Sequence, residues 1–210
     1  MKYRKRLLTT AILAVALATF TALYALYAEY GFAREVEARE RKLREQIVAT
    51  AARWIGTQEG DAGHERIVQT YNAHEPLAQG YEVTTSDNWC AAFASVAAIE
   101  TGLTGIIPTD CGCQRQIDLW KELGRWEEDD NYLPLPGDYI YYAWAEGWDF
   151  GDCTGWADHV GIVAGTAGPF IRVIEGNYAD QVVSRTILRG DMQIRGYGLP
   201  DYAATAKETE

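Results

Sequence analysis

The chain has 210 residues, of which 48% are hydrophobic, and its 30 acidic and 19 basic residues give a net charge of −11 at pH 7. This composition supplies enough apolar side chains for one sizeable core. All 30 acidic residues but only fifteen of the basic ones follow Arg6, so the rest of the chain has a net charge of −15. That balance argues against nucleic acid as a partner.

The first feature along the chain is a short basic segment, residues 1–6, followed by 22 uncharged residues, 7–28, rich in Ala and Leu. A run of this length can span a bilayer as a helix. It predicts a single-pass signal anchor in the cell membrane, with residues 1–6 cytoplasmic and the rest of the chain outside. The alternative is a secreted protein, cleaved near the small-residue triplet at 16–18. That cleavage would leave an apolar stretch at the mature terminus.

Residues 29–45 read as a charged helical connector. Acidic and basic side chains recur four residues apart, an arrangement that stabilises a helix surface. The pairs are Glu35–Arg39, Glu37–Arg41 and Glu40–Arg44. Only Val36, Leu43 and Ile47 recur as apolar positions, too few for a coiled-coil seam. We therefore expect a solvated stalk that runs into the first helix of the domain.

Residues 46–202 carry helical patterns first and strand patterns second, which predicts an α+β fold with helices packed on an antiparallel sheet. The expected helices are 43–54, 64–72, 90–101 and 114–123, and the expected strands are 139–144, 159–164, 170–175, 181–188 and 195–198. Residues 203–210 are expected to form a flexible tail.

Cys90 opens one of these helical patterns. Ser86, Asp87 or Asn88 can cap the helix and Gly102 can end it. A thiol in the first turn lies near unpaired N–H groups and the positive end of the helix dipole, and both favour the thiolate. The sequence therefore predicts a reactive cysteine here.

His159 and Glu175 lie on two strands that read as a hairpin around residues 165–169. If those five residues form the loop, His159 faces Glu175 directly and Asn177 lies diagonal to His159. Facing side chains in a sheet are close enough for a carboxylate to hold an imidazole. The prediction depends on the loop length, because a register slip of one residue would move one side chain to the other face.

Segment 46–202 resembles the CHAP domain, the cysteine- and histidine-dependent amidohydrolase/peptidase family of cell-wall lytic enzymes. The resemblance rests on 89–93 (WCAAF), 136–140 (PGDYI), 158–163 (DHVGIV) and 175–178 (EGNY). It implies a papain-like fold in which Cys90 is the nucleophile, His159 the base, Glu175 its orienting acid and Asn177 a fourth polar site residue. It also implies peptidoglycan peptide or amide bonds as the substrate.

The chain differs from many lytic relatives in having no recognisable wall-binding module. It also has no clear Asp-x-Asp-x-Asp-Gly calcium loop, and we expect neither a metal nor a cofactor. Cys111, Cys113 and Cys153 allow three readings: an incomplete zinc set, one disulfide with a free thiol, or structural cysteines.

His64 and His74 also compete for the role of base, but both precede Cys90, the wrong chain order for this arrangement. The tryptophans 144, 148 and 156 either line a substrate cleft or pack in the core.

The sequence thus indicates a membrane-anchored cysteine peptidoglycan amidase or endopeptidase. Two other classes stay open. One is an acyltransferase or transpeptidase that uses the same thiol with an amine acceptor. The other is a catalytically silent wall-binding scaffold, against which the joint presence of Cys90, His159 and Glu175 argues.

Overall fold

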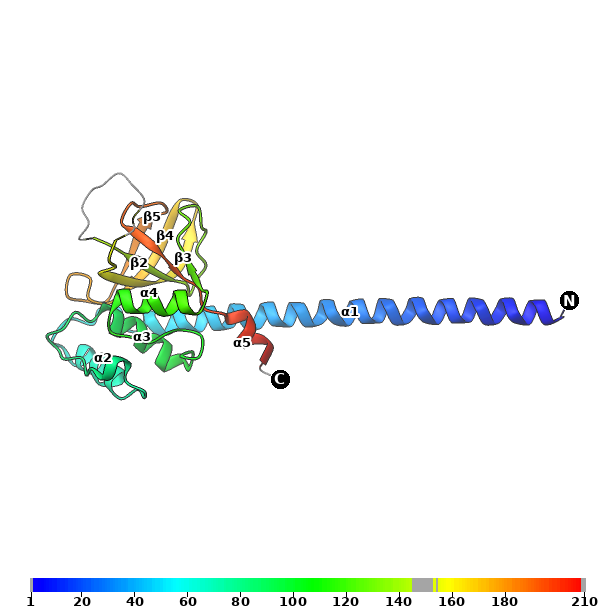
Figure 1. Cartoon of the computed structure of the whole chain (residues 1–210), viewed down its shortest axis with the longest axis horizontal. Coiled ribbons are helices and arrows are strands. Elements are labelled where there is room, and N and C mark those ends of the chain that lie inside the picture. Colours follow the sequence, from blue (N-terminus) through cyan, green and yellow to red (C-terminus); the bar gives the residue numbers. More distant parts are fainter. Residues whose placement is uncertain (1, 145–152, 154, 209–210) are drawn as a thin grey trace.

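The computed structural model describes residues 2–144, 153 and 155–208, with side chains described from residue 17 onward. Helices come first along the chain and strands second (Figure 1). The elements are α1 (Lys2–Ala52), α2 (Ala62–Asn72), η1 (Ala78–Gly80), α3 (Cys90–Thr101), α4 (Cys113–Glu122), β1 (Trp126–Glu127), β2 (Tyr139–Tyr142), β3 (His159–Ala167), β4 (Phe170–Glu175), β5 (Val183–Leu188), β6 (Ile194–Gly198) and α5 (Tyr202–Glu208).

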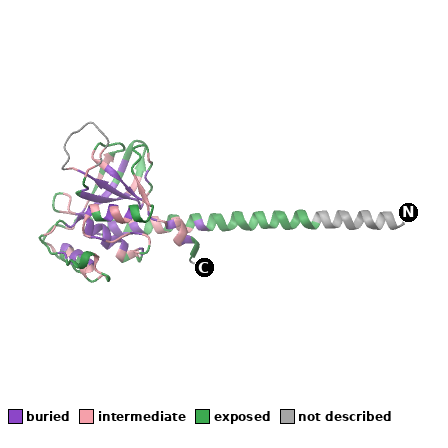
Figure 2. Ribbon diagram, in the orientation of Figure 1, coloured by how far each residue is buried: buried purple, intermediate pink, exposed green. Residues whose placement is uncertain are grey.

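Helix α1 is one continuous element of 51 residues. At about 1.5 Å per residue it is roughly 75 Å long, and most of it projects from the domain as a rod (Figure 1). Residues 17–35 of this rod are exposed (Figure 2). Its last turns enter the core, where Ile47 and Ala51 are buried. Two of the predicted pairs, Glu35–Arg39 and Glu40–Arg44, are ion pairs at 3.8 and 2.9 Å. The connector is therefore helical, as predicted.

None of the helices contains a stretch long and apolar enough to cross a membrane, as far as the described residues go. Residues 7–16 of the predicted anchor have no described side chains.

The strands form one six-stranded sheet in the order β1-β6-β2-β3-β4-β5, and every neighbouring pair is antiparallel. The α+β class and the antiparallel sheet are confirmed. Strand β1 was not predicted, because its two residues are too few to show any alternation.

The sheet has a buried cluster on each face. One face packs against α1, α3 and α4 and contributes Tyr139, Tyr141, Val160, Ile162 and Ile174 to the main core, while α2 packs on α3. The other face carries a smaller cluster of Ile140, Tyr142, Val163, Ile171, Val173 and Tyr197. Successive strand residues point to opposite faces, and both faces carry buried side chains here. The sequences of β2, β3 and β4 are therefore nearly continuous apolar runs.

The predicted flexible tail is wrong for residues 203–208, which belong to helix α5. Tyr202 starts this helix and is fully buried, and its hydroxyl donates to the Gly137 carbonyl at 2.8 Å. The guanidinium of Arg44 on α1 lies 4.6 Å from the Tyr202 ring centroid. The buried Tyr202 ring holds α5 against α1. The short polar sequence that follows Tyr202 gives no sign of this contact.

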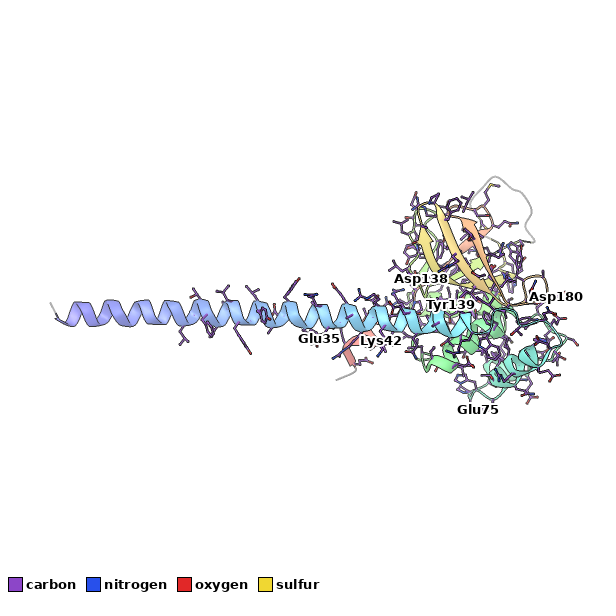
Figure 3. All side chains as sticks on the ribbon, turned by 180° about the vertical axis from the view of Figure 1, so that it is seen from behind. Glu35, Lys42, Glu75, Asp138, Tyr139 and Asp180 are labelled. Carbon is purple, nitrogen blue, oxygen red and sulfur yellow. The ribbon has the colours of Figure 1, made fainter. Side chains whose placement is uncertain are left out.

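Arg44 also joins α1 to the sheet. Its Nη1 donates to Asp138 Oδ1 at 2.9 Å, and Asp138 lies where the sheet approaches α1 (Figure 3). The Asp138 carboxylate is buried and accepts two further bonds, from the Tyr132 hydroxyl and the Leu135 N–H. A buried charge with this many partners is satisfied. The end of α1 is therefore fixed to the strand half of the domain.

Candidate active site

Cys90 is the first residue of α3, and Gly102 ends the helix in the left-handed conformation at φ 69°, both as predicted. The predicted cap is wrong. The N-cap is Trp89, which makes no side-chain capping bond, and the Asp87 carboxylate instead accepts from the Thr84 N–H at 2.7 Å. The N-cap residue thus leaves the first-turn N–H groups of α3 uncapped, and the buried Cys90 thiol lies beside them.

The predicted hairpin register is also wrong. The turn consists of Gly168 and Pro169 alone, since Ala167 already pairs with Phe170. Glu175 pairs with Gly161, two residues beyond His159. The predicted five-residue loop failed because residues 165–167, half-buried or exposed and weakly patterned, continue β3.

A bulge restores the predicted face. The register shifts between Val163 and Gly165, so Ala164 has no partner on β4. Without this extra residue, Glu175 would pair with Ile162 and point to the face opposite His159. With it, Glu175 and His159 lie on the same face, two residues apart along the ladder.

Gly161 lets the carboxylate cross that gap. A Cβ at this position would lie 2.7 Å from Glu175 Cγ and would collide with a methyl of Val173. Because no side chain stands there, Glu175 Oε1 comes within 3.5 Å of His159 Nε2. The sequence prediction that these two side chains meet holds, by a different route.

Glu175 is more tightly bound to Arg185 on β5 than to His159. Arg185 Nη2 donates to Oε1 at 2.9 Å, and its Nε donates to Oε2. The 3.5 Å contact with His159 is an ion-pair distance, and His159 Nε2 has no hydrogen-bond partner among the described residues. Burial alone would raise the pKa of Glu175, but Arg185 and His159 lower it below its usual range. The carboxylate is therefore held charged and in place by Arg185.

Cys90 and His159 form a coupled pair. Burial alone would lower the pKa of His159, but its contacts with Cys90 and Glu175 raise it to about 9. A contact with Cys113, then the contact with His159, lower the pKa of Cys90 well below its ordinary value, against the effect of burial. Each group favours the charged form of the other, as a thiolate and an imidazolium do.

Aromatic rings surround the imidazole. Trp144 stacks on His159 with ring centroids 4.1 Å apart and planes inclined by 22°, and the Tyr142 and Tyr178 centroids lie 5.7 and 6.3 Å away. Arg185 lies 4.0 Å from the Tyr178 ring centroid. This shell orients the ring and lowers the local dielectric, which strengthens its charge interactions.

The three tryptophans singled out in the sequence differ in their surroundings. Trp144 packs on His159 and so belongs to the site. Trp156 is 73% exposed. Trp148 lies outside the described residues.

Asn177 does not contact His159 in any described interaction. It follows β4 in the left-handed conformation at φ 56°, and its Nδ2 donates to Asn88 Oδ1 at 3.5 Å. Gly176 before it lies directly on Phe93 of α3, where a Cβ would be 2.6 Å from the Phe93 ring. Asn177 therefore ties the end of β4 to the segment that leads into Cys90.

The three remaining cysteines lie in different surroundings. Cys113 lies in the site, its Sγ 3.6 Å from Cys90 Sγ. Cys111 is a half-buried thiol outside any disulfide, and Cys153 Sγ lies 3.8 Å from the Gln193 carbonyl oxygen. Within the described ranges no three His, Cys, Asp or Glu side chains gather closely enough to share a metal ion.

His64 is buried on α2. Its Nδ1 accepts from the Gly60 N–H at 3.0 Å and its ring packs on Trp89 at 4.7 Å, so it supports the residue that precedes Cys90.

Sequence reasoning gave Cys113 no role in the site and missed Arg185, Gly161, Tyr142 and Tyr178. Cys113 begins a helical pattern just as Cys90 does, and that shared position is the one signal that could have marked it. Arg185 carried no local signal, because its role depends on the pairing of β4 with β5.

No family model matches the chain, and no curated protein does. Among solved structures the chain is similar to "The crystal structure of Ly7917", with 14% identity over 76% of this chain and 62% of that one, at a TM-score of 0.43. It is also similar to Ly7917 "with the hydrolyzing product of MDP", with 18% identity over 53% of each chain, at a TM-score of 0.35. The matched part spans less than two thirds of the Ly7917 chain, and neither likeness is strong enough to assign a fold family.

Proposed function

We propose that this protein is a cysteine-dependent peptidoglycan hydrolase with a CHAP-like, papain-type site, in which Cys90 is the nucleophile, His159 the acid and base, and Glu175 the orienting group. The observation that carries the proposal is the continuous contact from the helix-borne thiol through the imidazole to a buried carboxylate. The amide class of substrate rests on this geometry. The peptidoglycan assignment rests on the resemblance of residues 89–93, 158–163 and 175–178 to the CHAP family.

The first half of the reaction forms an acyl-enzyme. The Cys90 thiolate attacks the carbonyl carbon of a peptide or amide bond, and the carbonyl oxygen becomes an oxyanion. The Cys90 N–H, at the start of α3, is our candidate for one hydrogen-bond donor to that oxyanion. The intermediate collapses as the His159 imidazolium gives its proton to the departing amine, leaving a thioester.

The second half releases the product. Neutral His159 takes a proton from water, and the resulting hydroxide attacks the thioester carbon. The carbon–sulfur bond breaks, the carboxylate product leaves, and the Cys90 thiolate is restored beside an imidazolium. Glu175 stabilises that imidazolium throughout, and Arg185 keeps Glu175 charged.

The same thiol could pass its acyl group to an amine in place of water. A buried site disfavours bulk water, and Cys90 and His159 are only 4% and 3% exposed. This observation is why an acyltransferase stays our second candidate. Attachment to the cell membrane through residues 7–28, with the domain outside, stays a prediction from the sequence.

The test is mass spectrometry of the fragments released from purified peptidoglycan by the full chain, with and without an added amine. Hydrolysis predicts new carboxylates, whereas transfer predicts products that carry the amine. Cys90→Ala and His159→Ala should each reduce release to background, and the double variant should be no worse than either, because these residues act as one unit. Release that survives in folded Cys90→Ala would reject the nucleophile.

A further inference from the structure

The geometry points to Cys113 as a positioning residue of the site, whose S–H donates a hydrogen bond to the Cys90 thiolate and holds it charged for attack. This inference deepens the proposed function and rests on Cys90 being the nucleophile. It gives a role to a buried thiol that the reaction steps do not use.

The two sulfurs meet between two helix starts. Cys90 is the first residue of α3 and Cys113 the first of α4, with Gly112 as its N-cap. Their Sγ atoms are 3.6 Å apart, within hydrogen-bond range for sulfur, and both side chains are buried. Two positive helix ends facing one thiol pair favour a single negative charge shared between them.

The surroundings decide which sulfur carries that charge. His159 contacts Cys90, and the Ala91 N–H bonds to it as well. Cys113 instead faces the carboxylate of Asp158, whose charge disfavours a second anion there. Together with the contact to Cys90, burial raises the pKa of Cys113 well above its ordinary value. Cys90 is therefore the acceptor and Cys113 the donor.

The ionisable groups that face this pair come from strands β2 and β3 and from the segment just before β3. They are His159 on β3, Asp158 just before β3, and Tyr141 on β2. Tyr141 is already engaged: its hydroxyl donates to Gln116 and accepts from Trp120. The hydrogen bond from Cys113 thus adds to the contacts that His159 and the Ala91 N–H make with the Cys90 sulfur.

The test measures the charge state of Cys90 without any substrate. The full chain, kept under a reductant that is removed just before labelling, is treated with iodoacetamide across a pH series. The rate of Cys90 alkylation is then followed by peptide mass spectrometry. Cys113→Ala should move the midpoint of that profile to higher pH by about one unit or more, the size expected for a hydrogen bond to a charged group.

Cys113→Ser keeps a donor and should restore most of the shift. Cys111→Ala, two residues away on a thiol that faces Tyr71, should leave the profile unchanged. Thermal unfolding of each variant identifies any loss of fold, and thiolate ultraviolet absorbance of Cys113→Ser against wild type provides a second measure.

An unmoved or lowered midpoint in folded Cys113→Ala would overturn the inference, as would equal behaviour of the Ala and Ser variants. Because the readout needs no turnover, its outcome is separate from that of the function. A chain that shows this dependence on Cys113 but releases nothing from peptidoglycan would keep the positioning role and reject the proposed function.

Discussion

Glu175 is paired with Gly161 in the ladder between β3 and β4, and it reaches the neighbouring imidazole across the space that a side chain on Gly161 would fill. The contact between Glu175 and His159 therefore depends on Gly161, a residue without a side chain.

Gly161→Ala should disable the site more than it destabilises the domain. The new methyl would meet Glu175 Cγ at 2.7 Å and a methyl of Val173, so the carboxylate must move away from His159. Overpacking of this kind costs about 1–3 kcal/mol. Gly165→Ala on the same strand is the control, because a Cβ there meets nothing within 4 Å. Chemical denaturation and peptidoglycan release measure both effects. Equal activities in the two variants would contradict the role given to Gly161.

The pH profile should show an alkaline limb set by His159. The pKa of His159 is raised to about 9, so its imidazolium is fully present below the ordinary value of about 6.5 and is lost as the pH rises through about 9. Activity should fall over that interval, because the neutral ring cannot protonate the departing amine.

Glu175→Gln removes a charge that raises this pKa, so the alkaline limb should move to lower pH and the rate should drop. Activity measured against pH on both proteins decides the matter. A limb that stays in place would mean that Glu175 does not stabilise the imidazolium.

Arg185→Ala should destabilise the fold by roughly 3 kcal/mol, the usual cost of leaving a buried charge without its partner. Glu175 is fully buried and its pKa is lowered by Arg185. Its stabilisation is therefore present above the ordinary pKa of about 4.3 and is lost as the pH falls below it. The penalty should accordingly shrink in acid.

Arg172→Ala, an exposed arginine on β4, is the matched control and should change stability by less than about 0.5 kcal/mol. Urea unfolding of both variants at neutral and acid pH makes the comparison. If the two variants unfold alike, Arg185 does not hold Glu175.

Asn177→Ala should lower activity by less than about tenfold, the size of one neutral hydrogen bond, because its described bond is to Asn88. Glu175→Ala should lower it by about 100-fold or more, since it impairs the acid–base group. Asn177→Gly separates the lost bond from the backbone, because glycine accepts the φ of 56° without strain. The opposite ranking of the two alanine variants would make Asn177 the third member of the site.

Residues 7–28 predict that the full chain sediments with membranes and stays there after a high-salt wash, since salt screens charge attachment but not an apolar span. External protease should then remove the domain from intact cells. A shortened chain in the medium, beginning near Thr19 or Glu29, would favour the secreted alternative.

Local pattern was enough for the elements that hold the site. The apolar run between Cys90 and Gly102 defined α3 at both ends, and β4 was predicted with its observed bounds. The bulge at Ala164 could not be predicted, because whether a strand residue is paired depends on its partner strand rather than on its own sequence. The same holds for Cys113, which meets Cys90 only once α4 has packed beside α3.

His159 and Glu175 meet across the hairpin as predicted, but only part of the predicted reason is correct. The predicted loop was too long, and the true turn with one bulged residue shifts the ladder by an even number, which keeps Glu175 on the face of His159.

Helix α1 runs without a break from Lys2 into the core beside Ile47 and Ala51. A continuous helix transmits rotation as well as length, so whatever holds its first turns also sets the direction in which the domain faces. Each residue inserted into the exposed part would lift the domain by about 1.5 Å and turn it by about 100°. Inserting seven residues into the helix would leave the direction of the domain nearly unchanged, whereas inserting two would nearly reverse it. The number of residues in the helix therefore sets both the distance between the domain and the start of α1 and the direction in which the domain faces.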